Sequence, residues 1–190
     1  MREEVIRELA ESAEIKKAVM KNLADTIVTA AATIIDAYKA GKKVLLIGNG
    51  GSAADAQHIA SELVGRLRRE RKALPAIALT TDTSTLTSLA NDYGYDAVFS
   101  RQLEALVNRG DVLIAITTSG TSPNILKAID TARSLGAVVI ALTGEKGKQL
   151  SNKTELTITV PSANTQRIQE AHITIGHIIC HLVEQELFVD

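Results

Sequence analysis

A chain of 190 residues is long enough to bury a sizeable core, and we expect a single domain over residues 1–190. Its net charge of −1 gives no basis for binding nucleic acid or an anionic membrane surface. A lone cysteine, Cys180, excludes an intrachain disulfide. With no visible signal peptide and no apolar run of membrane-spanning length, we expect a cytoplasmic protein.

The first 40 residues carry an amphipathic helical pattern. Apolar residues recur at helical spacing from Val5 to Tyr38, and Gly41 follows as a suitable C-terminal cap. The pattern predicts long N-terminal helices, broken once into two. So much helix before the first strand indicates oligomerisation through helices, although packing within one subunit is an equally simple interpretation.

A strand, a glycine-rich turn and a helix follow over residues 44–63. The apolar run 44–47 predicts a buried strand, residues 48–51 read Gly-Asn-Gly-Gly, and a helix follows from Ser52. This arrangement presents backbone N–H groups and a helix N-terminus to an anion, usually a phosphate. The dinucleotide glycine pattern and the P-loop lysine are both missing, so NAD and ATP are disfavoured.

His58 and Glu62 lie four residues apart and therefore on one face of that helix. They could be an ordinary surface pair contributing only a few tenths of a kcal/mol. An imidazole and a carboxylate behind a phosphate-binding turn instead favour chemistry on a sugar phosphate. The basic run 65–72 predicts a solvated helix end, with only Arg66 placed to serve such a site.

The middle of the chain contains a second candidate anion site. A strand over 76–79, a polar segment over 80–88, a turn over 91–94 and a helix over 97–108 come first. The strand 111–116 then leads into the hydroxyl-rich run 117–122, ahead of a helix that begins at Pro123. These hydroxyls could simply cap the helix, but their number favours a phosphate site.

Further strands over 137–142 and 156–160 complete about five strands that alternate with helices. This alternation predicts an α/β fold with a parallel sheet flanked by helices, whose ligands bind at the carboxyl ends of the strands. A long C-terminal helix is expected over 165–187. On it we expect Glu170 to pair with Arg167, while His172, Cys180 and His181 have structural roles.

Five segments together resemble the sugar isomerase (SIS) domain family, which has a flavodoxin-like fold and binds phosphosugars. They are residues 48–62, 74–79, 90–92, 117–122 and 167–170, and the resemblance extends over nearly the whole chain. Within SIS domains the match is most similar to the phosphoheptose isomerase family. That resemblance implies conversion of sedoheptulose 7-phosphate into D-glycero-D-manno-heptose 7-phosphate for lipopolysaccharide heptose.

The resemblance also implies roles for individual residues. Substrate binding falls on residues of the two loops, of the turn after the second strand and of the last helix: Asn49, Gly50, Gly51, Ser52, Glu62, Asn91, Asp92, Thr117, Thr118, Ser119, Ser122 and Gln169. Thr117 stands where the family is expected to have serine, which keeps the hydroxyl. One catalytic zinc per subunit is implied, with ligands on His58, Glu62, Gln169 and His177.

Aldose–ketose isomerisation explains these residue types. A carboxylate can carry the proton between C1 and C2, which is the expected role of Glu62, and an imidazole can handle ring opening and oxygen protons, which is that of His177. Gln169 and His177 are about 12 Å apart along one helix. Either one ion lies between their extended side chains, or different subunits supply them, and the family implies a homotetramer.

Two other functions are open at this point. A non-catalytic SIS tetramer that binds the bacterial replication initiator has some similar sequence, including residues 90–92, but Glu62 and His177 favour the enzyme. A sugar-phosphate sensor controlling transcription is disfavoured because the chain carries no helix-turn-helix module or basic extension.

Overall fold

The computed structural model describes residues 1–188 and contains one five-stranded parallel sheet. The strand order is β2-β1-β3-β4-β5, as in flavodoxin-like folds, so the predicted architecture is confirmed. The strands are β1 (Val44–Gly48), β2 (Ala76–Ala78), β3 (Val112–Ile116), β4 (Val138–Gly144) and β5 (Leu156–Val160). In register, Val44 of β1 lies opposite Ala76 of β2 and Val112 of β3.

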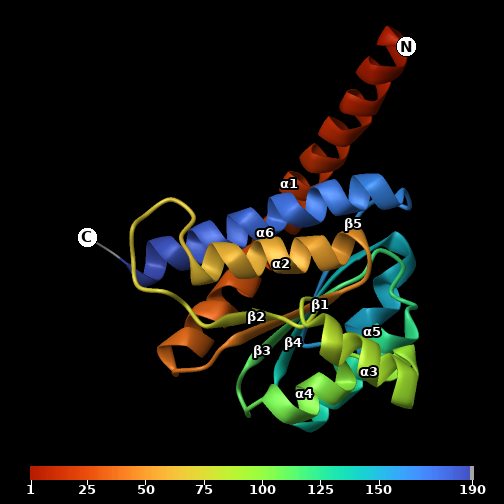
Figure 1. The fold of residues 1–190 in the computed structure, drawn as a ribbon. Coiled ribbons are helices and arrows are strands. Elements are labelled where there is room, and N and C mark those ends of the chain that lie inside the picture. The colour runs from red at the N-terminus through yellow and green to blue at the C-terminus, as the bar shows by residue number, and fades with distance from the viewer. Residues whose placement is uncertain (189–190) are drawn as a thin grey trace.

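Helices cover both faces of the sheet (Figure 1). They are α1 (Arg2–Lys39), α2 (Gly51–Val64), α3 (Thr83–Tyr93), α4 (Ser100–Leu106), α5 (Pro123–Ser134) and α6 (Thr165–Leu187), with 3-10 turns η1 (Tyr95–Ala97) and η2 (Glu145–Asn152). Successive strand residues point to opposite faces. Leu46 and Ile114 therefore pack with α1, α2 and α6, whereas Leu45 and Leu113 pack with α3, α4 and α5.

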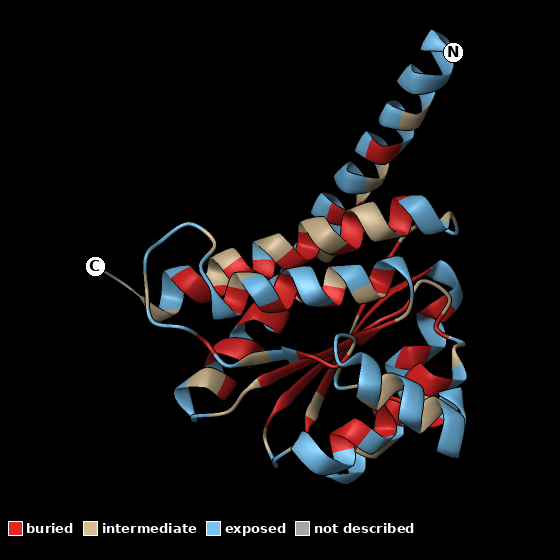
Figure 2. Cartoon of the chain, in the orientation of Figure 1, coloured by how far each residue is buried: buried red, intermediate tan, exposed pale blue. Residues whose placement is uncertain are grey.

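The N-terminal segment is a single helix of 38 residues, so the predicted break into two helices is wrong. Residues 10–14 read Ala-Glu-Ser-Ala-Glu, which includes neither glycine nor proline to interrupt the hydrogen bonds. The first turns of α1 project beyond the sheet and its helices (Figure 1) and are mostly exposed (Figure 2).

α1 is long and apolar enough, by length and composition alone, to cross a membrane. A helix that packs in the core of a folded domain passes the same test. Here the apolar side of α1 packs against α6 and β5, and Ile27 and Ile34 are buried there. Packing within the domain therefore accounts for part of its apolar composition, while Met20 and Val28 stay exposed.

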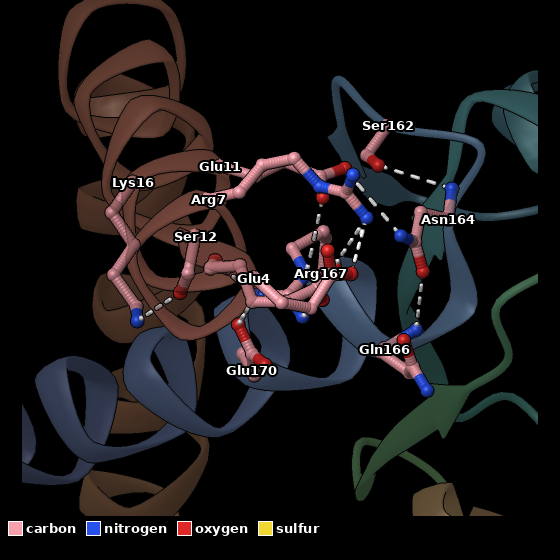
Figure 3. Close-up of polar contacts among 11 residues, drawn as sticks. Glu4, Arg7, Glu11, Ser12, Lys16, Ser162, Asn164, Gln166, Arg167 and Glu170 are labelled. Atoms are coloured by element: carbon pink, nitrogen blue, oxygen red, sulfur yellow. Dashed lines mark hydrogen bonds and ion pairs between the residues drawn. The ribbon is translucent and has the colours of Figure 1, made fainter. Parts of the chain in front are cut away.

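A buried arginine anchors α1 to the start of α6 (Figure 3). Only 6% of Arg167 is exposed, and its guanidinium donates to the carbonyl oxygen and to Oε2 of Glu8, both at 2.8 Å. It also donates to Oε2 of Glu170 at 3.1 Å, which confirms the predicted pair. At the helix start, the side chain of Asn164 accepts a hydrogen bond from the backbone N–H of Gln166.

Two parts of the chain differ from the sequence predictions. Helix α3 takes up most of the polar segment 80–88 and residues 91–93 of the predicted turn 91–94, because Asp82 caps it and Leu86 and Leu89 pack against the core. The helix predicted over 97–108 is shorter, since residues 95–97 form the turn η1.

The basic run 65–72 is only partly solvated. Arg66 is exposed, but the side chains of Arg71 and Glu184 are only 2% and 1% exposed and form an ion pair at 3.2 Å. Burial alone would raise the pKa of Glu184, but backbone N–H groups of residues 67–69 and the Arg71 charge outweigh it and hold that pKa low. This pair ties the loop after α2 to α6.

Candidate active site

The two predicted anion-binding loops follow β1 and β3, the neighbouring strands at which the strand order reverses. The turn after β1 needs glycine, since a Cβ on Gly48 would lie 2.4 Å from the carbonyl oxygen of Ser52. Gly50 has a φ of +55°, which disfavours other residues. Ser52 is buried in the first turn of α2. The backbone amides of this turn therefore begin a helix, as an anion site requires.

The hydroxyl loop of residues 117–122 uses some of its hydroxyls internally. Thr117 is buried, and its Oγ1 accepts the backbone N–H of Gly120 at 3.2 Å. Ser119 Oγ accepts from the backbone and side chain of Thr121. Ser122 occupies the N-cap position of α5, yet its side chain caps nothing among residues 1–188. Ser122 is therefore not explained as a helix cap, and Thr118, Ser119 and Ser122 are all partly exposed.

α2 and α6 lie side by side (Figure 1). The predicted catalytic residues Glu62 of α2 and His177 of α6 both lie close to His58. His58 Nε2 is 3.3 Å from Oε1 of Glu62 and 3.3 Å from Nε2 of His177. The two imidazole rings stand edge to face, with centroids 4.8 Å apart. Two imidazole nitrogens and a carboxylate oxygen therefore converge on one point, although His177 is far from His58 and Glu62 in the sequence.

This trio of His58, Glu62 and His177 fits a metal ion. One ligand atom from each residue lies within 4.8 Å of the others. Each of these three atoms presents a lone pair unless a ring nitrogen carries a proton. Because lone pairs that face one another repel, a proton or a cation has to lie between them. Two histidines and one carboxylate are also the protein ligands of many catalytic zinc sites, which keep a position open for substrate.

Gln169 does not join the trio within one chain. Its amide lies against Gly51 at the start of α2, where a Cβ on Gly51 would be 2.6 Å from its Nε2. Eight residues of α6 separate Gln169 from His177, a rise of about 12 Å. Within one subunit, the glutamine therefore lies beside the glycine-rich turn after β1 rather than beside the histidines.

Asn91 and Asp92 lie exposed at the C-terminal end of α3, where Asn91 Nδ2 donates to Oδ1 of Asp92 at 2.8 Å. The residues just after them reach the first loop, because the Tyr95 hydroxyl donates to Oδ1 of Asn49 at 3.2 Å. The side chain of Asn49 also pairs with that of Asn124 in α5.

Sequence reasoning missed three polar residues at this site: Asp55, Tyr95 and Asn124. Asp55 is one turn before His58 on the same helix face, and its Oδ2 is buried with no hydrogen-bond partner among residues 1–188. Burial raises the pKa of the Asp55 carboxyl to about 6, and the nearby His58 partly opposes this. Its spacing of three from His58 and seven from Glu62 could have indicated it.

Comparison with known proteins identifies the family. The SIS domain family model matches residues 9–144. A phosphoheptose isomerase from Aquifex aeolicus is 56% identical over 185 residues, which cover 97% of each chain. The chain belongs to the phosphoheptose isomerase family of SIS domains.

Solved structures of this family agree in fold. The phosphoheptose isomerase GmhA from Neisseria gonorrhoeae has a TM-score of 0.92 and 42% identity, covering 97% of this chain and 98% of its own. The enzyme from Francisella tularensis has a TM-score of 0.91 and 38% identity over the same shares of the two chains. The expectation of an enzyme is therefore confirmed, and the family is one of aldose–ketose isomerases.

Proposed function

We propose that this protein interconverts sedoheptulose 7-phosphate and D-glycero-D-manno-heptose 7-phosphate. The observation that carries the proposal is the convergence of His58, Glu62 and His177. His58 and Glu62 lie about two and three helical turns after the glycine-rich turn, and His177 meets them from α6. Relatives at 50–56% identity over nearly the whole chain bear the name phosphoheptose isomerase. Its product would be a precursor of lipopolysaccharide heptose, made in the cytoplasm.

The two loops would hold the phosphate and the sugar backbone. Thr118, Ser119 and Ser122 offer hydroxyls at the start of α5, and the turn 49–51 offers backbone N–H groups at the start of α2. Asn91 and Asp92 would add contacts to the sugar hydroxyls. Gln169 lies against Gly51 and would contact the substrate near that turn.

Isomerisation moves two protons and leaves the composition of the sugar unchanged. The Glu62 carboxylate takes the proton from C1 of the ketose and delivers it to C2, through an enediolate. His177 moves the second proton, from the C1 hydroxyl to the C2 oxygen, and assists ring opening. Because Oε1 of Glu62 faces His58, we assign the carbon-bound proton to Oε2.

The trio would hold one zinc ion per subunit, which disperses negative charge on the C1 and C2 oxygens when bound. Gln169 as fourth ligand would come from a second copy of the chain, given its distance from the trio along α6. His58 would act only as a ligand, and its Nε2 faces the ligand atoms of both Glu62 and His177.

A homotetramer with sites at subunit interfaces is part of the proposal. An apolar groove of about 270 Å³ lies between α1 and α6. Met20 and Val28 on α1 and Ile178 on α6 line it, and they are 70%, 57% and 41% exposed. Burying such side chains against another subunit would be favourable.

Replacing Glu62 tests the proton-transfer role. We expect Glu62→Gln to lower kcat at least about a hundredfold, because the amide cannot accept the carbon-bound proton. Circular dichroism and binding of the phosphosugar should be retained. Glu104→Gln is the control, since this exposed residue lies in α4 on the opposite face of the sheet. Full activity of Glu62→Gln would remove Glu62 as the base.

A further inference from the structure

A pair of asparagines, of which Asn124 is buried and Asn49 is partly exposed, joins the glycine turn and the hydroxyl loop. Asn49 lies in the turn after β1, and Asn124 is the second residue of α5, directly after the hydroxyl loop. Asn49 Nδ2 donates to Asn124 Oδ1 at 3.0 Å, and Asn124 Nδ2 donates to Asn49 Oδ1 at 2.9 Å. The two side chains so form a reciprocal amide pair across the sheet's switch point.

Two further hydrogen bonds hold this pair in place. Asn124 Oδ1 also accepts the backbone N–H of Ile125 at 3.0 Å, and Asn49 Oδ1 accepts the Tyr95 hydroxyl at 3.2 Å. Only 2% of Asn124 is exposed. Since an amide oxygen has two lone pairs, both oxygens are fully used within the protein.

The pair is therefore fitted to hold the loops rather than to bind substrate through its oxygens. We propose that Asn124, with Asn49 and Tyr95, is a positioning clamp that fixes the spacing between the glycine turn and the hydroxyl loop. The inference rests on the proposed function in one respect, that both loops hold a single phosphosugar.

The loops need such a clamp because glycines make them flexible. Gly50 and Gly120 have φ values of +55° and +67°, and glycine loses more backbone entropy on ordering than other residues. A clamp formed before the ligand arrives removes that cost from binding. Without it, the two loops would have to be brought together by the ligand itself, at the expense of affinity.

A double-mutant cycle tests the clamp, with inorganic phosphate as the probe in the presence of a chelator and then sedoheptulose 7-phosphate. We expect Asn124→Ala to weaken binding of both about tenfold, which is the effect of losing roughly two hydrogen bonds. KM should rise by a similar factor and kcat should change less. Asn49→Ala should do the same, and the double variant should be no weaker than either single variant.

Two other variants complete the experiment. Tyr95→Phe removes only the third contact, and because Tyr95 is exposed the variant keeps the test available should Asn124→Ala not fold. It should weaken phosphate binding about twofold to fivefold in the wild type, and have no effect once Asn49 is alanine. Asn108→Ala, an exposed asparagine at the amino end of β3, is the matched control and should change nothing.

Unchanged phosphate affinity in the folded Asn124→Ala variant would overturn the clamp, and so would losses that simply add in the double variant. A merely structural role would lower the melting temperature without this non-additive change in affinity. Phosphate binding does not depend on turnover. Wild-type protein that binds phosphate through the clamp but does not convert the heptulose phosphate would count against the proposed function alone.

Discussion

At the scale of single residues, the side chains that form or support the site each need a specific protonation state or a specific packing environment. His172 is not part of the trio, but it supports the hydroxyl loop and illustrates this requirement. It is fully buried, and its Nε2 lies 3.3 Å from the carbonyl oxygen of Thr143, at the end of β4. The next residue, Gly144, donates its backbone N–H to the carbonyl oxygen of Thr118 in the hydroxyl loop. His172 therefore supports the loop from behind as a neutral group.

Because His172 is buried, we expect the free energy of unfolding to fall in acid. Burial lowers the pKa of His172 from 6.5 to about 4, partly offset by the hydrogen bond to Thr143. The pKa of His172 is lower in the folded chain than in the unfolded chain. The residue therefore contributes stability above pH 6.5, and this contribution is lost as the pH falls towards 4. The loss from His172 alone should be about 3 kcal/mol.

Urea denaturation between pH 7 and pH 4 measures this loss. His172→Gln keeps a donor for Thr143 but cannot take up a proton, so its stability should fall less steeply with pH than that of the wild type. Gln185→Ala, at an exposed residue of the same helix that takes up no proton, is the control and should keep the wild-type slope. Equal slopes for all three proteins would contradict the assignment to His172.

At the scale of elements, the spacing of α2 and α6 sets the geometry of the trio. Gly176 precedes His177, and Ile59 follows His58. A Cβ on Gly176 would lie 2.5 Å from Cδ1 and 2.7 Å from Cγ1 of Ile59. The helices approach this closely only because residue 176 has no side chain, and the close approach brings the two histidine rings together.

Gly176→Ala should therefore weaken metal binding. We expect the added methyl group to push α6 away from α2, because it meets the Ile59 side chain, and so to separate His58 from His177. We expect zinc affinity, measured by competition with a chelator, to fall about tenfold, although alanine favours the helix. Adding Ile59→Ala makes room for the methyl group and should restore part of the affinity. Wild-type zinc affinity in Gly176→Ala alone would show that the spacing does not matter.

The elements also show what sequence patterns can predict. All five strands and the bounds of α6 follow from apolar runs and flanking turns, because buried strands and amphipathic helices leave local patterns. Helix α3 does not, because its threonines and serines disfavour helix, and the Asp82 cap and the packing of Leu86 and Leu89 stabilise it. The Asn49–Asn124 pair joins residues 75 positions apart, a contact that no local pattern contains.

At the scale of the whole molecule, the exposed apolar residues of α1 predict an oligomer. Light scattering of the purified protein should give the mass of a tetramer. Met20→Glu should shift it to smaller species, because a carboxylate at the groove between α1 and α6 cannot be buried without a partner. Lys21→Glu, at an exposed neighbour outside the groove's lining, is the charge control. A wild-type monomer would contradict both the oligomer and a fourth ligand from a second copy.

We propose that this chain is a metal-dependent phosphosugar isomerase, and the fold, the two loops and the trio support this proposal. The most direct test is conversion of sedoheptulose 7-phosphate by the purified protein, with chelator and after zinc is restored. We expect formation of D-glycero-D-manno-heptose 7-phosphate, loss of turnover with chelator and recovery with zinc. A well-folded oligomer that gives no product with any divalent metal would contradict the proposed reaction, and turnover unaffected by complete metal removal would contradict the role of the trio as a metal site.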